Sequence, residues 1–288
     1  MLQVARLAPN LLQAAADRVA DFLHGRFNPD GGVADRAGRS DLYYTVFGLE
    51  GLLALRRDLP VDPVRRFLAG FGDGPDLDLV HLTCLARAWA ALPKGALDAS
   101  LASLLKRRID RFRAGDGGFA AEPGAPHGTV YHAFLALGAL QDAGASLDDP
   151  QALLRSVLSL RAEDGSFANR PGLRSGTTPT TAGAVALLRA LEAPVPPGAA
   201  DWLLDRARAE GGFLPVPQAP MPDLLSTATA LHALSILKAP IGFLKEPTLD
   251  FIDTLWTGQA FCGSWADDIQ DAEYTYYGLL ALGHLSLA

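Results

Sequence analysis

The sequence predicts an all-α fold: an (α/α)6 toroid in which an outer ring of six amphipathic helices surrounds an inner ring of six apolar helices. Three observations predict it. A glycine-rich pattern recurs along the chain, amphipathic and wholly apolar segments alternate, and no segment shows the two-residue alternation of a strand. An open solenoid of helix pairs is the competing arrangement, but its inner helices would present a wetter concave face than these segments do.

The recurring pattern is a pair of small residues followed by an apolar or aromatic residue. Its last four copies are spaced 48, 46 and 52 residues apart, and the first gap of 86 residues is close to two such periods. A degenerate copy, Phe71-Gly72-Asp73-Gly74-Pro75, fills that gap. The clear copies begin at Gly31, Gly117, Gly165, Gly211 and Gly263.

Each repeat is interpreted as a helix, a glycine-rich loop and a second helix. The helix before the loop is amphipathic, as in residues 101–112, whereas the helix after it is nearly all apolar or small, as in residues 227–237. Prolines fall at the joints, where a missing N–H costs least. One domain is expected, with hairpins at about residues 8–57, 60–92, 97–142, 149–192, 197–238 and 246–287.

Composition and charge exclude several classes of protein. With 288 residues, 49% hydrophobic and 20% charged, the chain is not disordered, collagen-like or a coiled coil, and its net charge of −7 disfavours nucleic-acid binding. Two cysteines, Cys84 and Cys262, lack CxxC spacing and predict no disulfide framework. With no signal peptide and no apolar run long enough to span a bilayer, we expect a cytoplasmic protein without a transmembrane segment.

The six inner helices, aligned on their apolar bodies, place chemically active residues in two layers at one end of the toroid. Each residue of the outer layer lies three positions before a residue of the inner layer, one helical turn away on the same face. Asp and Thr are preferred N-caps, so capping is the competing interpretation of the outer layer. The inner layer is Tyr44, His81, His132, Thr180, Ser226 and Tyr274, and the outer layer is Asp41, Asp78, Thr129, Thr177, Asp223 and Asp271.

A zinc site is predicted within these layers. His81 and His132 occupy equivalent positions on neighbouring inner helices, which pack about 8–10 Å apart, so their imidazoles could converge. With Asp78 they would form a His, His, carboxylate set that suits zinc. The competing interpretation of each histidine is a hydrogen-bonded interior residue. Cys84, one turn beyond His81, is a further candidate ligand, and core packing is its favoured interpretation.

Aromatic residues are concentrated on the inner helices of the first, third and sixth hairpins. An aromatic-lined cavity would suit a long apolar ligand and could stabilise a carbocation through cation–π contact. Single rings at helical spacing, in contrast, usually fill a core. The residues expected to bind substrate are Asp41, Phe47, Tyr131, Phe134, Asp223, Asp271 and Tyr277.

Two segments resemble the prenyltransferase and squalene oxidase repeat family, which includes protein prenyltransferase β subunits and squalene-hopene-type cyclases. Residues 35–45 look like the prenyltransferase segment D-K-P-G-K-S-R-D-F-Y-H-T, with Tyr44 where the family's zinc histidine stands. Val130-Tyr131-His132-Ala133 is similar to the F-Y-H-T part, and there His132 matches the histidine. The resemblance covers all six hairpins and implies the toroid fold, an isoprenoid substrate and a helical partner subunit of α type.

Other family motifs match only in part. The remaining zinc ligands of the family align with Leu79 and His81, so Asp78 would have to substitute. Asp76-Leu77-Asp78-Leu79 looks like the DxDD motif of class II terpene cyclases, in which Asp78 would be the general acid. Asp267-Asp268-Ile-Gln-Asp271 matches the DDxxD string that binds magnesium in class I enzymes, and is interpreted mainly as a chance match with Asp271 as a cap.

The leading hypothesis from the sequence is an isoprenoid-processing enzyme of prenyltransferase type. Zinc on Asp78, His81 and His132 would activate a nucleophile, while Tyr44 and Tyr274 would orient a diphosphate or contact an allyl cation. One alternative is a small class II-like cyclase with Asp78 as its acid. Another is a toroid without catalysis that binds an apolar ligand or a protein. A carbohydrate-active toroid ranks last, because only one tryptophan, Trp265, lies near the expected rim.

Overall fold

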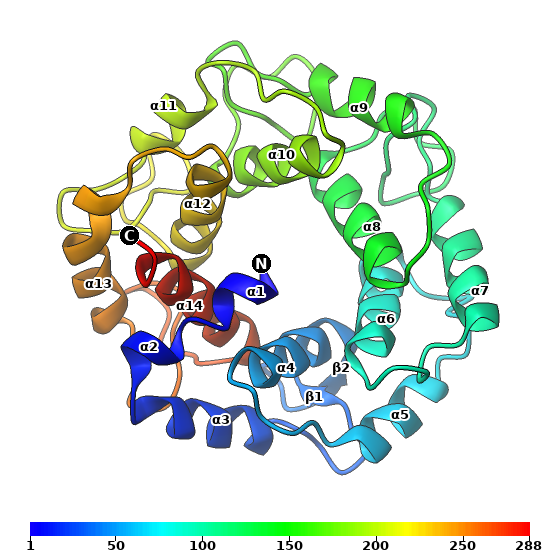
Figure 1. The fold of residues 1–288 in the computed structure, drawn as a ribbon. Coiled ribbons are helices and arrows are strands. Elements are labelled where there is room, and N and C mark those ends of the chain that lie inside the picture. Colours follow the sequence, from blue (N-terminus) through cyan, green and yellow to red (C-terminus); the bar gives the residue numbers. More distant parts are fainter.

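The computed structural model describes residues 1–288, which form a closed ring of two concentric layers of helices (Figure 1). The predicted all-α toroid is confirmed. The inner layer consists of α4 (Leu42–Ala54), α6 (Leu79–Ala91), α8 (Val130–Asp142), α10 (Thr178–Ala190), α12 (Leu224–Ile236) and α14 (Ala272–Leu285). The outer layer consists of α3 (Ala15–Gly25), α5 (Val61–Ala69), α7 (Ala99–Asp110), α9 (Pro150–Ser159), α11 (Ala199–Leu204) and α13 (Lys245–Thr254). The structure has no helix with the length and hydrophobicity that crossing a membrane requires.

The two layers follow from the distribution of apolar residues. Outer helix α5 buries Val64 and Leu68 on one face while Arg65 and Arg66 on the other face are exposed. Inner helix α4 instead buries residues around most of its circumference, including Leu42 and Leu49. Burial on all sides requires neighbours on all sides, and a helix of the inner ring has them.

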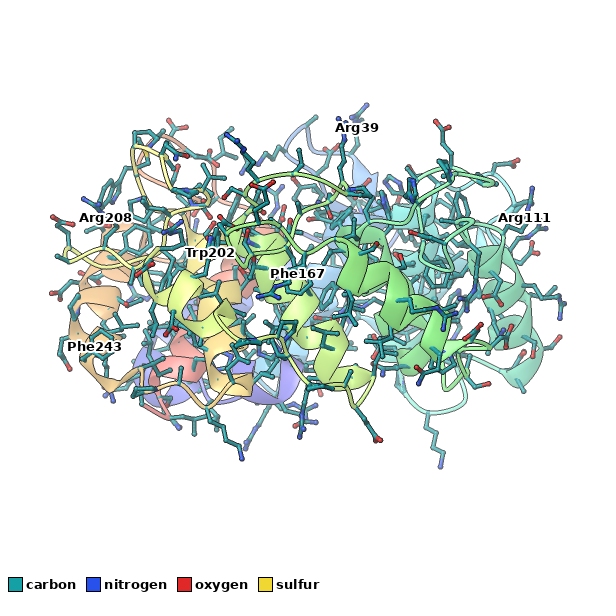
Figure 2. The ribbon with its side chains drawn as sticks, turned by 90° about the horizontal axis from the view of Figure 1, so that it is seen from above. Arg39, Arg111, Phe167, Trp202, Arg208 and Phe243 are labelled. Carbon is teal, nitrogen blue, oxygen red and sulfur yellow. The ribbon has the colours of Figure 1, made fainter.

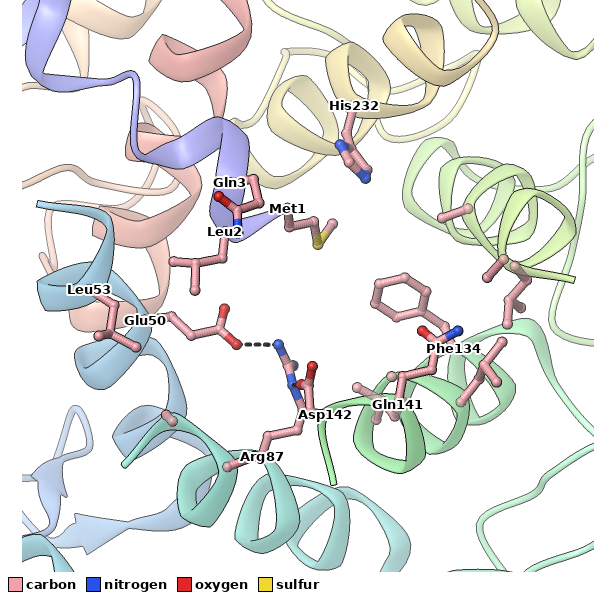
Figure 3. A pocket seen from close by; sticks show the side chains of 18 of the residues that line it. Met1, Leu2, Gln3, Glu50, Leu53, Arg87, Phe134, Gln141, Asp142 and His232 are labelled. Carbon is pink, nitrogen blue, oxygen red and sulfur yellow. Dashed lines mark hydrogen bonds and ion pairs between the residues drawn. The ribbon is translucent and has the colours of Figure 1, made fainter. Parts of the chain in front are cut away.

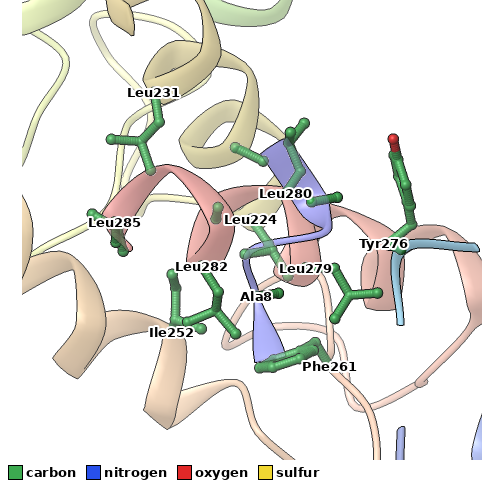
Figure 4. Close-up of a cluster of buried hydrophobic side chains, with 14 of the residues drawn as sticks. Ala8, Leu224, Leu231, Ile252, Phe261, Tyr276, Leu279, Leu280, Leu282 and Leu285 are labelled. Atoms are coloured by element: carbon green, nitrogen blue, oxygen red, sulfur yellow. The ribbon is translucent and has the colours of Figure 1, made fainter. Parts of the chain in front are cut away.

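Contacts between successive inner helices run all the way round and close the ring. Each inner helix packs against the next, and the last, α14, packs against the first, α4. Closure distinguishes the toroid from the open solenoid, which would leave its end helices without a second neighbour. Figure 4 shows part of the core near the closure, where Leu231 of α12, Ile252 of α13 and Leu282 of α14 lie together.

The repeated glycine pattern has a structural explanation in the loops between outer and inner helices. Its aromatic residue is a core residue: Phe119, Phe167 and Phe213 are fully buried. In the edge-on view of Figure 2, Phe167 lies at mid-height among the helices, whereas Arg39 and Arg208 extend from the periphery. Gly211 has a φ of 96°, and a Cβ there would lie 1.8 Å from the carbonyl oxygen of Pro247. Glycine therefore permits the loop to pack tightly on the next outer helix. In the first loop, β1 (Val33–Ala34) pairs with β2 (Ser40–Asp41).

Two short N-terminal helices that the sequence did not predict lie across the inner ring. They are α1 (Leu2–Ala5) and α2 (Pro9–Leu12), and the chain begins near the middle of the ring (Figure 1). Helix α1 packs against α14 and α4. The contact requires Gly283, because a Cβ at this position would lie 2.1 Å from the carbonyl oxygen of Val4. A short 3₁₀ helix, η1 (Gly242–Leu244), precedes α13.

Candidate functional site

The end of the ring at which the six inner helices begin, here called the mouth, carries the residues of both predicted layers. Every residue of the outer layer accepts a hydrogen bond from the backbone N–H three positions later and so caps its helix. The capping interpretation therefore accounts for Asp41, Asp78, Thr129, Thr177, Asp223 and Asp271. Burial raises the pKa of Asp223 above its usual value, despite the hydrogen bonds that it accepts from Ser226.

The DDxxD string is held by Arg36 from the first loop. Arg36 Nε lies 2.8 Å from Asp271 Oδ2, and its Nη2 lies 2.7 Å from Asp267 Oδ2. Asp271 is fully buried and also caps α14. The guanidinium supplies the positive charge that a magnesium ion would otherwise bring, and no three carboxylate, histidine or cysteine groups are arranged to hold a metal ion. The residues present do not fit magnesium.

The three residues predicted to bind zinc do not come together either. His81 Nδ1 lies 2.9 Å from Asp78 Oδ1, and its Nε2 lies 3.4 Å from Asp41 Oδ2, so both nitrogens already face carboxylates. His132 Nδ1 instead lies 2.9 Å from Thr129 Oγ1, the hydroxyl that caps its own helix. The caps orient the two rings separately, so the chain's residues do not fit a zinc ion. Cys84 is buried, which raises the pKa of its thiol to about 12, and it belongs to no group of three residues that could hold a metal ion.

Asp78 has the wrong environment for the general acid that the DxDD resemblance implied. Its side chain is 60% exposed. Partial burial acts to raise its pKa, but the hydrogen bonds from the backbone and ring of His81 outweigh this and lower the pKa below the usual value. Asp78 is therefore ionised at neutral pH, whereas a general acid must keep its proton.

Replacing Asp78 separates capping from catalysis. Asn caps helices as well as Asp does, so Asp78→Asn should leave the free energy of unfolding within about 0.5 kcal/mol, whereas Asp78→Ala should cost about 1 kcal/mol. Urea denaturation of both variants measures this difference. A loss of turnover in Asp78→Asn, with stability unchanged, would instead show that Asp78 is the acid.

The structure brings the aromatic side chains of the first and sixth hairpins together below the mouth. The Tyr43 and Phe47 rings are 5.0 Å apart, and the Phe47 and Tyr277 rings 5.6 Å apart, measured between centroids. Tyr44 contacts Tyr43 and Tyr274 contacts Tyr277, which extends this group toward solvent. We call Tyr43, Tyr44, Phe47, Tyr274, Tyr276 and Tyr277 the aromatic group. From the third hairpin, Tyr131 is exposed, and Phe134 lines a cavity at the other end of the ring.

Glu273, the second residue of α14, is a half-buried carboxyl beside the aromatic group that the sequence analysis missed. The Tyr43 hydroxyl donates a hydrogen bond to Glu273 Oε1 over 2.7 Å. Burial, aided by the nearby negative charge of Asp271, raises the pKa of Glu273 to about 7, although the Tyr43 hydrogen bond and Arg36 act to lower it. A sequence signal did exist, since Glu273 is an acid in an otherwise apolar inner helix.

The sequence matches the family described as prenyltransferase alpha-alpha toroid domain over residues 7–70, 76–219 and 180–286. The chain belongs to this family. No curated protein matches it.

Solved structures share this family fold at low sequence identity. A variant of the type II terpene cyclase MstE from Scytonema, in complex with its substrate geranylgeranyl dihydroxybenzoate, gives a TM-score of 0.65 at 14% identity over 97% of each chain. Candida albicans protein geranylgeranyltransferase-I complexed with GGPP gives a TM-score of 0.54 at 15% identity over 99% of this chain and 83% of that one. A protein from Actinoplanes gives 0.58 at 16% identity over 96% and 99%. At these identities the likeness is one of fold.

Proposed function

We propose that this protein processes an isoprenoid and starts the reaction by protonating an alkene, with Glu273 as the general acid. One observation carries the proposal: a carboxyl whose pKa is raised to about 7 lies beside a group of electron-rich aromatic rings. At neutral pH about half of the molecules hold the proton that such a reaction needs. Asp78 is ionised and cannot donate the proton. Glu273 therefore takes the role of general acid that the DxDD resemblance implied for Asp78, in the same class of reaction.

The proposed reaction is an isomerisation. The O–H bond of Glu273 breaks, its proton forms a C–H bond with an alkene carbon, and the other alkene carbon becomes a tertiary cation. A second alkene of the chain attacks this cation and forms a C–C bond, which closes a ring. Loss of a proton from a neighbouring carbon to water ends the reaction, and solvent returns a proton to Glu273. No diphosphate leaves in this sequence.

The aromatic group would stabilise the cation in this reaction. A cation over an aromatic face gains about 0.5–2 kcal/mol, the larger value where water is excluded. Tyr44 and Tyr274 sit nearest the mouth, and Phe47 and Tyr277 sit deeper, so the cation would meet aromatic faces as the ring closes. The substrate named for MstE, a geranylgeranyl chain on an aromatic acid, is the first compound to test.

Reaction in deuterated water tests the proposal. Purified protein incubated with geranylgeranyl dihydroxybenzoate should yield a cyclic isomer that carries one non-exchangeable deuterium, detected by mass spectrometry and NMR. Diphosphate release from geranylgeranyl diphosphate, in the presence of zinc or magnesium and a thiol acceptor, would favour prenyl transfer instead. Binding of both compounds without turnover would favour a toroid that holds an isoprenoid without catalysis.

A further inference from the structure

The outer surface of the ring is divided into a basic side and an acidic side. Helices α5, α7 and α9 lie along one side, and α11 and α13 lie along the opposite side, with α7 across the ring from α13 (Figure 1). In the edge-on view, Arg111 at the end of α7 and Phe243 just before α13 extend from opposite sides (Figure 2). The exposed side chains of these two sets of helices differ in charge.

Exposed arginines without an ion-pair partner cover the first side, here called the basic wall. The other two basic side chains of α7 both form ion pairs with carboxylates. Asp62 is the one carboxylate of these three helices that lacks an ion pair, so positive charge dominates the wall. The basic wall consists of Arg65 and Arg66 of α5, Arg107 and Arg111 at the end of α7, and Arg155 of α9.

Exposed carboxylates without an ion-pair partner cover the opposite side, here called the acidic wall. On α13 they are spaced four and three residues apart, which places them on one helix face, opposite buried Thr248 and Ile252. Lys245, the one basic residue of α11 and α13, donates a hydrogen bond to the carbonyl oxygen of Ala288. Phe243 adds an aromatic side chain that is 68% exposed. The acidic wall consists of Asp201 and Asp205 at α11, Phe243, and Glu246, Asp250 and Asp253 of α13.

The two walls cannot neutralise each other within one molecule. A line between them crosses two outer and two inner helices, each about 10 Å wide, so the walls are about 40 Å apart. At physiological ionic strength, charges are screened over about 8 Å. Each wall therefore acts as a separate surface, and a contact between opposite walls of two molecules is attractive despite the net charge of −7.

We propose that copies of this chain associate side by side, with the basic wall of one copy against the acidic wall of the next. Arginine forms bidentate pairs with carboxylates, and the exposed ring of Phe243 offers its face to a further guanidinium. Because the walls lie on opposite sides, every added copy leaves one wall of each kind free, so association continues as a chain. Both ends of the ring stay open, including the cavity of about 630 Å³ opposite the mouth (Figure 3). The association therefore does not depend on Glu273 or on the proposed reaction.

Sedimentation velocity of the whole protein tests the proposal. In about 50 mM NaCl, the average mass should rise with protein concentration beyond that of a dimer, as expected for a contact that does not close. In about 500 mM NaCl, the screening length shortens to about 4 Å, so the association constant should fall at least about tenfold. Protein that stays monomeric up to about 100 μM in the low-salt buffer would overturn the proposal. Monomeric protein that binds poly-lysine would assign the acidic wall to a basic partner of another kind, and would overturn it too.

Charge reversal on each wall identifies the contact. Arg107→Glu with Arg111→Glu reverses part of the basic wall, and Glu246→Lys with Asp250→Lys reverses part of the acidic wall. Each variant alone should stay monomeric, because like charges now face each other. A mixture of the two variants should associate again, since it contains one intact wall of each kind. Association that persists in either variant, or a mixture that stays monomeric, would place the contact elsewhere and overturn the proposal.

A matched control separates the walls from the net charge. Arg170 and Arg174 are exposed in the loop before α10, away from both walls. Replacing both with Glu changes the net charge by the same amount as the basic-wall variant. This control should associate within about threefold of the wild type, because its charges lie beyond the screening length from the contact. Loss of association in the control as large as in the basic-wall variant would show that net charge alone governs association, and would overturn the proposal.

Discussion

Replacing Glu273 with Gln is expected to lower the rate of isoprenoid cyclisation by about 10²- to 10⁴-fold, the contribution of a general acid. Gln has the same shape and still accepts the hydrogen bond from the Tyr43 hydroxyl, so the fold should be unchanged. Steady-state rates with geranylgeranyl dihydroxybenzoate, beside circular dichroism of both proteins, measure this. A variant that keeps more than about a tenth of the wild-type rate would show that another group delivers the proton.

The pH dependence tests the same residue independently. Activity requires protonated Glu273, whose pKa burial raises to about 7, so the rate should be highest below this pH and fall about tenfold per unit above it. Tyr43→Phe removes a hydrogen bond that stabilises the carboxylate, so the fall should move to higher pH. A fall centred near pH 4.5, the ordinary pKa of Glu, would contradict the assignment.

The pH dependence of the free energy of unfolding reports the pKa of Glu273 without any substrate. The folded protein holds a proton up to about pH 7 that the unfolded chain releases near pH 4.5. The stabilisation from this proton is fully present below pH 4.5 and is lost as the pH rises through 7. Glu273→Gln should remove the decrease in the free energy of unfolding that occurs between about pH 4.5 and 7. Urea denaturation of both proteins across this pH range measures it. Identical pH profiles of stability in both proteins would show that Glu273 titrates normally.

Replacing Arg87 with Met is expected to destabilise the protein by about 3–5 kcal/mol, the largest effect on stability that we predict. Arg87 bridges Glu50 of α4 and Asp142 of α8, and without it the Glu50 carboxylate remains buried without a partner. Met retains most of the apolar contacts of the arginine stem. Thermal and urea denaturation of wild type and variant measure the difference.

A double variant separates the lost ion pair from lost packing. Glu50→Gln combined with Arg87→Met removes both charges, so it should recover at least about 2 kcal/mol of the loss. Arg57, whose guanidinium pairs with Asp17 where the side chains are 42% and 74% exposed, provides a surface comparison. Arg57→Met should cost less than about 1 kcal/mol. If the double variant is no more stable than Arg87→Met, then Arg87 stabilises the protein by packing alone.

The fold was predictable because it depends on periodicity, whereas the site depends on side-chain orientation. The repeat spacing and the alternation of apolar and amphipathic helices are properties of the sequence alone, and so is the alignment that predicted six N-caps. The placement of His81 and His132 in one layer was also inferred from that alignment. The two imidazoles are nevertheless oriented by different caps, His81 by Asp78 and His132 by Thr129, so the expected zinc ligands do not converge. The sequence does not show these side-chain contacts.

Glu273 was not predicted because the helix alignment selects only the first residue of each apolar body and the residue one turn earlier. Glu273 lies between Asp271 and Tyr274, at neither of those positions. The sequence does contain a signal for it: Glu273, Glu50 and Arg87 are charged residues in inner helices that are otherwise nearly all apolar. The pKa of Glu273 could still not be inferred, since it depends on burial in the folded ring and on a hydrogen bond from Tyr43, which lies far away in the sequence.

Closure of the ring affects how the protein unfolds. In a linear array of repeats, end units have one neighbour and can fray, so stability builds up unit by unit. In this protein α14 packs against α4, so every hairpin has a neighbouring hairpin on both sides. Removing any one hairpin would expose the apolar flanks of two others. The six hairpins are therefore expected to melt as one cooperative unit with no stable sub-arrays, although each has the sequence of a modular repeat.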